Sequence, residues 1–278
     1  MKLKLSILFF VFSLITLAQQ NFVINGVCLK TDNSKKIYLT YQVNGKGITK
    51  SSEITNNKFV FKGELDFPTR ATICTDPKFQ MTTLNSNVFY LEPNVMNIKL
   101  DFDNLNTIVI NESKATDEFN SLQNKAEKEK FQKKMDSIRE SSRLYSVKIS
   151  GTSDSSLKIQ FQKSLDSLNQ LWDQLVDQNR NKIMQLELEF IKKNPNSYIA
   201  PDLLYKILTE GDDQIPYDTI NNLYDKLGPE VKKSFAGKQL AERLLDFKNS
   251  RIGSLAPDFV LKDINHTTIR LSSFYNNQ

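Results

Sequence analysis

The two cysteines are the side chains in this sequence best suited to redox chemistry, because a thiolate is a strong nucleophile and two thiols can form a disulfide. Cys28 and Cys74 both lie in segments rich in β-branched and aromatic residues, which are typical of strands. They are too far apart in the sequence to form a C-x-x-C motif with each other. Two interpretations stay open: one disulfide between them, or two buried thiols that pack as small apolar groups.

Other side chains that could perform catalysis or bind a metal lack suitable neighbours. His266 is the single histidine, and no cysteine lies at zinc-ligand spacing from it. Its place after Asn265 predicts an exposed hairpin turn, whose second residue prefers positive φ. The carboxylates of Glu187 and Glu189 are expected on different sides of a helix. With no phosphate-binding glycine loop and no G-x-S-x-G motif, the sequence predicts no catalytic residue, no cofactor and no metal site.

Residues 1–18 have the features of a secretory signal peptide. Lys2 and Lys4 precede an almost unbroken apolar run that ends at Leu17, and Ala18 is a small residue suited to a cleavage site. The run is shorter than the ~20 residues of a membrane-spanning helix, which argues against an uncleaved anchor. We therefore expect export to the periplasm or cell envelope, with no membrane span after cleavage. Export also makes a disulfide chemically feasible.

Length and charge limit the class of protein. A chain of 278 residues fits two or three domains, and its 39% hydrophobic and 25% charged residues suit a soluble globular protein. The net charge of +5, from 37 basic and 32 acidic residues, is spread along the chain. We expect no nucleic-acid partner, because such a partner is normally bound by a concentrated basic surface.

Residues 19–112 have the pattern of a β-rich module. Six short segments rich in β-branched and aromatic residues are separated by turn signals. They are 22–29, 36–41, 58–63, 70–75, 88–92 and 97–102. Phe59 and Phe61 alternate with residues of the opposite face, which predicts one buried and one mostly wetted face. The regular spacing predicts an antiparallel β-sandwich or an open barrel.

Residues 113–250 change to a helical period. Two long amphipathic segments flank the polar stretch 150–156 and predict an antiparallel helical hairpin, a surface for self-association or for a partner. Ten residues of the second segment, at steps of three and four, are expected on one face. They are Leu157, Phe161, Leu165, Leu168, Trp172, Leu175, Asn179, Ile183, Leu186 and Phe190. Three shorter helices are predicted at 198–208, 216–227 and 229–247, the first capped by Ser197.

Six short motifs follow one another through the first part of the chain. They are Phe22-x-Ile-x-Gly26, Ile37-Tyr-Leu, Phe59-x-Phe-Lys-Gly63, Pro68-Thr-x-Ala71, Phe89-Tyr-Leu-Glu-Pro93 and Glu118-Phe119. In this order they resemble the domain of unknown function that often precedes thioredoxin-like domains in exported bacterial proteins. The resemblance covers about a third of the chain and implies no established reaction.

Two further motifs lie in residues 251–278. They are Ala256, Pro257, Asp258 and Phe259, followed by Leu271, Ser272, Ser273 and Phe274. At this spacing they resemble the first hairpin of a thioredoxin-like domain of the redoxin type, the class of the alkyl hydroperoxide reductases. In that class the thiolate of a later C-x-x-C attacks a disulfide or a peroxide. The resemblance implies a catalytic domain that is truncated before its C-x-x-C, and we expect this tail to be poorly ordered or loosely docked on the helices.

The sequence thus predicts an α+β protein and leaves three hypotheses for its function. In the first, the chain is the N-terminal accessory part of a cell-envelope thioredoxin-like thiol–disulfide oxidoreductase; it binds or positions a partner and is inactive as given. In the second, it is a stand-alone exported binding or scaffold protein that uses the β module and the helical hairpin to bind an envelope protein or to self-associate. In the third, a frameshift or premature stop removes the catalytic domain, and the nucleotide sequence after codon 278 distinguishes this case.

Overall fold

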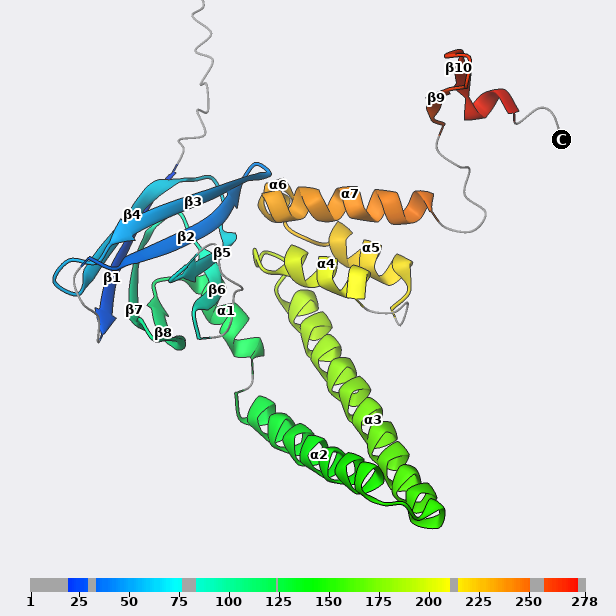
Figure 1. Cartoon of the computed structure of the whole chain (residues 1–278). Coiled ribbons are helices and arrows are strands. Elements are labelled where there is room, and N and C mark those ends of the chain that lie inside the picture. Colours follow the sequence, from blue (N-terminus) through cyan, green and yellow to red (C-terminus); the bar gives the residue numbers. More distant parts are fainter. Residues whose placement is uncertain are drawn as a thin grey trace, which may run out of the picture.

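The protein is an α+β chain in which two β-sheets precede a helical region and a small C-terminal hairpin (Figure 1). The computed structural model describes residues 20–29, 34–76, 84–123, 125–210, 215–250 and 258–274. The predicted leader at 1–18 lies outside the described residues, as do Ala256 and Pro257 of the C-terminal motif.

The N-terminal part contains two four-stranded sheets. The strands are β1 (Gln20–Leu29), β2 (Lys36–Val43), β3 (Lys46–Glu53), β4 (Lys58–Leu65), β5 (Thr69–Cys74), β6 (Ser86–Leu91), β7 (Val95–Asp101) and β8 (Asn104–Asn111). The order is β4–β1–β7–β8 in the first sheet and β3–β2–β5–β6 in the second. The six predicted strands are present, but β3 and β8 were not predicted. Both are edge strands, whose polar side chains stay largely exposed and so hide the alternation that marks a half-buried strand.

The expectation of a wholly antiparallel arrangement is wrong at one pair of strands. β1 pairs antiparallel with β4 but parallel with β7. A parallel pair needs a crossover connection, and here the chain passes through β2 to β6 before it returns beside β1. The short turns that the sequence shows between strands do not reveal which sheet each strand joins, so this pairing could not be predicted.

One apolar core lies between the inner faces of the two sheets. Ile24 from the first sheet and Leu39 and Ile73 from the second are fully buried within it. The alternation predicted around Phe59 and Phe61 is confirmed, since both rings are buried in this core while the intervening side chain is exposed. The two sheets are therefore held together by burial of apolar side chains from both.

Two glycines of the first sheet lie against the phenylalanine rings of the neighbouring strand. The β1–β4 register pairs Gly26 with Phe59 and Phe22 with Gly63. A Cβ atom at Gly26 would lie 2.0 Å from the Phe59 ring, and one at Gly63 would lie 2.6 Å from the Phe22 ring. Each strand carries Phe and Gly four residues apart, so in antiparallel strands each ring covers the other strand's glycine. These two motifs therefore specify the register of β1 and β4.

Between β8 and the C-terminal hairpin, the described residues form seven α-helices. They are α1 (Lys114–Leu122), α2 (Lys125–Gly151), α3 (Ser155–Lys193), α4 (Ala200–Glu210), α5 (Tyr217–Asp225), α6 (Pro229–Lys233) and α7 (Phe235–Asn249). The predicted hairpin is confirmed as α2 and α3, which project from the rest of the molecule (Figure 1). Asp154 caps α3, since its carboxylate accepts from the N–H groups of Ser156, at 2.7 Å, and Leu157, at 3.1 Å.

The single apolar face predicted along α3 is wrong beyond its middle. Ile183 and Leu186 are exposed, whereas Met184, Leu188 and Ile191 are buried in a second core formed with the later helices. The first part of α3 packs on α2 and the last part on α4. Because the helix changes its neighbours, its buried face rotates.

The third of the shorter predicted helices is two helices in the structure. α6 and α7 are separated at Ser234, whose hydroxyl accepts from the Gly237 N–H at 3.1 Å and donates to the Val231 carbonyl at 2.6 Å. A Cβ atom at Gly237 would lie 2.3 Å from that carbonyl oxygen. Glycine is therefore needed where α6 and α7 meet.

The described part of the tail is a β-hairpin followed by a 3₁₀ turn. β9 (Val260–Lys262) pairs with β10 (Thr268–Arg270), and Leu271–Phe274 form the turn. His266 lies exposed in the connecting loop with a φ of 61°, as predicted. Most apolar side chains of the hairpin are exposed, and in Figure 1 it lies apart from the helical region.

Replacing Gly26 with alanine is expected to destabilise the β module. The new methyl group would meet the Phe59 ring, and such overpacking costs about 1–3 kcal/mol of the free energy of unfolding. The matched control is Gly47→Ala in β3, where no atom lies within 4 Å of the new Cβ and the change should stay within about 0.5 kcal/mol. Urea unfolding of both variants measures the difference, and equal effects would contradict the assigned register.

Candidate functional site

A cleft of about 770 Å³ lies between the second sheet and the helical region. Side chains of β2, β5 and β6 form one wall, and side chains of α1, α3, α4 and α7 form the other. Binding clefts commonly form where two structural units meet, because each unit supplies part of the lining. This cleft is accordingly the candidate functional site.

Tyr90 connects the two walls through a buried hydrogen bond. Its hydroxyl donates to the Asp202 carboxylate of α4 at 2.7 Å, and its ring belongs to the helical core although the residue lies in β6. Burial raises the pKa of Tyr90, and the Asp202 carboxylate raises it further. Burial also raises the pKa of Asp202, while Tyr90 and Arg70 oppose that shift. The phenol therefore remains a donor throughout the ordinary pH range.

Helix α1 is fixed to the end of β6 by a hydrogen-bonded cap. Ser113 is the N-cap, and its hydroxyl accepts from the Thr116 N–H at 3.1 Å and approaches the Tyr90 carbonyl as a donor at 3.0 Å. The Glu92 carboxylate accepts from the Ala115 N–H at 2.7 Å. These bonds satisfy donors at the start of α1 that otherwise lack partners. They also hold the backbone around Tyr90 in place.

The Glu118-Phe119 motif connects α1 to the rest of the helical region. Glu118 accepts a short hydrogen bond from the Ser197 hydroxyl, and Ser197 precedes α4. The same hydroxyl accepts from the Ile199 N–H at 3.3 Å, just before α4, which begins at Ala200 and so two residues later than predicted. The Phe119 ring packs edge-on against Tyr90, with ring centroids 5.7 Å apart. The motif therefore stabilises both sides of the Tyr90–Asp202 contact.

Glu187 is a buried carboxylate at the edge of the cleft. Its Oε1 is 2.7 Å from the Lys206 ammonium, which is much more exposed than Glu187. Within the described part of the chain, its Oε2 is a buried side-chain oxygen without a hydrogen-bond partner. Glu189 is exposed, which confirms that the two carboxylates lie on different sides of α3. The burial of Glu187 was not predicted, although the apolar residues Met184, Leu188 and Ile191 around it are a signal of a buried face.

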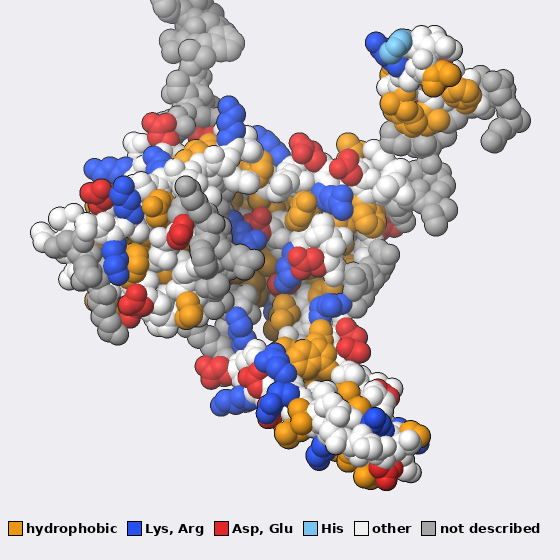
Figure 2. Space-filling model, in the orientation of Figure 1, with side chains coloured by type: hydrophobic (Ala, Val, Ile, Leu, Met, Phe, Trp, Pro, Cys, Tyr) orange, Lys and Arg blue, Asp and Glu red, His pale blue; other side chains and the backbone are white. Residues whose placement is uncertain are grey.

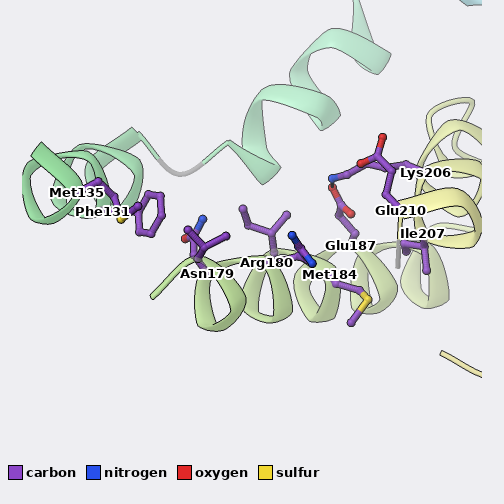
Figure 3. A pocket seen from close by; sticks show the side chains of 11 residues that line it. Phe131, Met135, Asn179, Arg180, Met184, Glu187, Lys206, Ile207 and Glu210 are labelled. Atoms are coloured by element: carbon purple, nitrogen blue, oxygen red, sulfur yellow. Dashed lines mark hydrogen bonds and ion pairs between the residues drawn. The ribbon is translucent and has the colours of Figure 1, made fainter. Parts of the chain in front are cut away.

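A second pocket of about 570 Å³ adjoins the cleft through Glu187 and Lys206. It lies between α2, α3 and α4, and Figure 3 shows its two ends. Phe131 and Met135 of α2 lie at one end, whereas Glu187, Lys206 and Glu210 gather at the other (Figure 3). The pocket is therefore apolar at one end and charged at the other.

The cysteines singled out by the sequence lie in the β module and are absent from the described lining of the cleft. Cys28 is in β1 of the first sheet and Cys74 in β5 of the second, and both side chains are fully buried as thiols. Burial raises the pKa of the Cys74 thiol, and the nearby Asp76 carboxylate raises it further. A raised pKa leaves less of the reactive thiolate.

The two C-terminal motifs meet in space. The Asp258 carboxylate accepts from the Ser272 N–H at 2.9 Å and from the Ser272 hydroxyl at 3.0 Å. These hydrogen bonds, with the nearby Arg270, lower the pKa of Asp258. The contact gives the aspartate and the serine of the motifs a structural role at the start of the 3₁₀ turn.

The described residues offer neither a metal-ligand cluster nor a membrane-spanning helix. Across them, no three or more His, Cys, Asp or Glu side chains are grouped so that they could hold a metal ion. Of the described helices, none combines the length and the apolar character that crossing a bilayer requires.

Comparison with protein families identifies the β module. Residues 22–119 match DUF4369, a domain of unknown function. The match includes β1 to β8 and ends at Phe119, the residue of α1 that packs on Tyr90. The comparison gives no evidence of a redoxin domain. Neither the curated proteins nor the solved structures contain a match to the chain.

The substitution Asp202→Asn is expected to change how stability depends on pH. Burial raises the pKa of Asp202 in the folded protein above its value in the unfolded chain. Asp202 therefore contributes its full share of folding stability only below the unfolded pKa, where it is protonated in both states. This share is lost as pH rises through the folded pKa. The asparagine variant should therefore gain stability relative to the native chain as pH rises above about 4, the ordinary pKa of an unfolded aspartate, until Asp202 is ionised in the folded protein.

Urea unfolding at a series of pH values measures this difference. The exposed residue Asp246 of α7 supplies the control, because Asp246→Asn shows the pH dependence that removal of a surface carboxylate produces. A difference for Asp202→Asn that shrinks as pH rises would show that the buried carboxylate is stabilised as an anion.

Proposed function

We propose that this chain is the accessory part of an exported thioredoxin-like thiol–disulfide oxidoreductase, and that it binds or positions a partner. The observation that carries the proposal is the cleft, which the DUF4369 domain and the helices build together. The chain's two thiols are buried elsewhere, in the sheets. Binding and thiol chemistry are therefore assigned to different parts of the protein.

The cleft is large enough to hold a ligand and has a polar lining. Its volume of about 770 Å³ lies within the range of about 300–1,000 Å³ that is usual for ligand pockets. Hydroxyl, amide and charged side chains from both walls face it, among them Thr72, Gln239 and Lys206. Such a lining can provide both hydrogen bonds and charge to a ligand or to a peptide segment of a partner.

The link to thioredoxin-like chemistry is supported by the C-terminal motifs. Asp258 and Ser272, one from each motif, are hydrogen-bonded to each other, as expected of motifs that act together in one hairpin. The reaction itself would need a C-x-x-C pair, and the two cysteines of this sequence do not have that spacing. Export to the periplasm or cell envelope is part of the proposal and is supported by the leader-like residues 1–18, and no nucleic-acid partner is proposed.

A stand-alone scaffold that self-associates through α2 and α3 is the second candidate. Leu144, Val147 and Ile159, near the tip of the hairpin, are 49%, 57% and 60% exposed. Figure 2 shows hydrophobic side chains interspersed with basic and acidic ones on this projection. Analytical ultracentrifugation distinguishes the candidates: a stable dimer of the purified chain favours the scaffold, and a monomer favours the accessory role.

The purified chain 19–278 should not reduce insulin faster than dithiothreitol does alone. Because both thiols are buried, they should react with a thiol reagent only after denaturation, which should release two thiols per chain. A complete thioredoxin serves as the positive control for insulin reduction.

Two outcomes would contradict the proposal. Reduction of insulin well above the background rate would assign catalysis to this chain itself. Rapid reaction of a cysteine in the native chain would show that a thiol of this chain is accessible and reactive. The variant Cys28→Ala would then show which of the two cysteines reacts. Absence of thiols in the unreduced, denatured chain would instead establish a disulfide between Cys28 and Cys74.

A further inference from the structure

The acidic and basic side chains that line the cleft select neither a simple anion nor a simple cation. In the described lining they are Arg70, Glu187, Asp202, Lys206 and Glu210, whereas Arg180 lines only the adjoining pocket. When all five are ionised they leave one net negative charge. Protonation of Asp202, whose pKa is raised by burial, brings the sum to zero. The ligand is therefore indicated by where the charges lie along the cleft.

Arg70 supplies a positive charge at one end of the cleft. It pairs across the sheet with Tyr90, whose hydroxyl donates to Asp202 in the first turn of α4. Its charge opposes the rise in the pKa of both residues, which places it near them. The Arg70 side chain is exposed and forms no hydrogen bond or ion pair with another described residue. Its guanidinium is thus available to a carboxylate, which it can hold with two parallel hydrogen bonds.

Glu210 supplies a negative charge farther along the cleft. It follows Asp202 by two turns of α4, a rise of about 12 Å. The Glu210 side chain is exposed and forms no hydrogen bond or ion pair with another described residue. Lys206, which Figure 3 shows beside it, instead contacts Glu187, at 2.7 Å. This end of the cleft therefore has an accessible carboxylate that can accept from an ammonium group.

Other side chains of the cleft can bind a peptide backbone. Thr72 from β5, Tyr205 from α4 and Gln239 from α7 line it, and their side chains form no hydrogen bond with another described residue. A peptide carries one backbone donor and one acceptor per residue, which hydroxyl and amide groups can satisfy. An extended chain spans about 3.3–3.6 Å per residue, so about three or four residues cover the distance of about 12 Å.

We infer that the cleft binds a short peptide with free termini, about three or four residues long, with its carboxylate on Arg70 and its ammonium group at Glu210. A zwitterion suits this lining because it adds no net charge and places each of its own charges beside an unpaired group of opposite sign. The inference rests on the proposed binding role of the chain and names the class of ligand for its cleft.

Calorimetric titration of the purified chain with trialanine tests the inference. Trialanine should bind saturably, with a Kd of about 1 mM or lower. Two blocked forms of the same peptide are the controls: the C-terminal amide lacks the carboxylate, and the N-acetyl form lacks the ammonium group. Each should bind with a Kd at least about tenfold higher, because each loses one charged hydrogen bond.

Variants of the chain identify which residue binds each terminus. Arg70→Gln should raise the Kd of trialanine at least about tenfold and should not weaken the C-terminal amide further. Glu210→Gln should raise it similarly and should not weaken the N-acetyl form further. Both side chains are exposed, so the fold should tolerate both changes. The controls Arg243→Gln and Glu242→Gln, at exposed residues of α7 outside the described lining, should change no Kd.

Any of four results would overturn the inference. Trialanine might fail to bind saturably, or a blocked form might bind as tightly as the free peptide. Arg70→Gln or Glu210→Gln might leave the Kd of trialanine unchanged, or each variant might pair with the opposite blocked form. The insulin and thiol measurements use no peptide ligand, so a failure of the peptide site is distinguishable from a failure of the accessory role.

Discussion

The hydrogen bond between Tyr90 and Asp202 is the interaction on which the arrangement of this protein depends. Tyr90 belongs to the sheet by its backbone and to the helical core by its side chain. Asp202 lies in the first turn of α4, so the bond fixes the helical wall of the cleft against the sheet wall. A hydrogen bond of this kind is valuable chiefly because losing either partner leaves the other buried and unsatisfied. The two cores are therefore coupled by one phenol and one carboxylate.

The short helix α1 makes this coupling rigid. Its N-cap holds the backbone at Tyr90, its Phe119 covers the Tyr90 ring, and its Glu118 binds the Ser197 hydroxyl at the start of α4. The DUF4369 match ends within this helix. The matched region therefore includes Glu118 and Phe119, which contact Ser197 and Tyr90. These contacts place the helical region beside the second sheet, and the cleft lies between the two.

The sequence predicts what depends on a strong local pattern and fails where tertiary neighbours decide. The alternation at Phe59 and Phe61, the helical hairpin and the surface position of His266 could all be predicted, because one face or one turn determines them. Edge strands β3 and β8 carry too little apolar alternation to be recognised. The rotation of the buried face of α3, and with it the burial of Glu187, follows from which helices pack on α3, and no local pattern specifies that. The cleft itself joins residues that lie far apart in the chain.

Helix α3 is one uninterrupted helix of 39 residues from the tip of the projecting hairpin to the second core. At about 1.5 Å per residue it is about 58 Å long, and a helix of this kind resists bending far more than a loop does. One end of this stiff helix therefore lies at the tip of the hairpin. Its other end lies beside the cleft and the pocket, where Glu187 contacts Lys206. A partner that displaces the tip would therefore act on the whole length of α3, including Glu187, which lines both the pocket and the cleft.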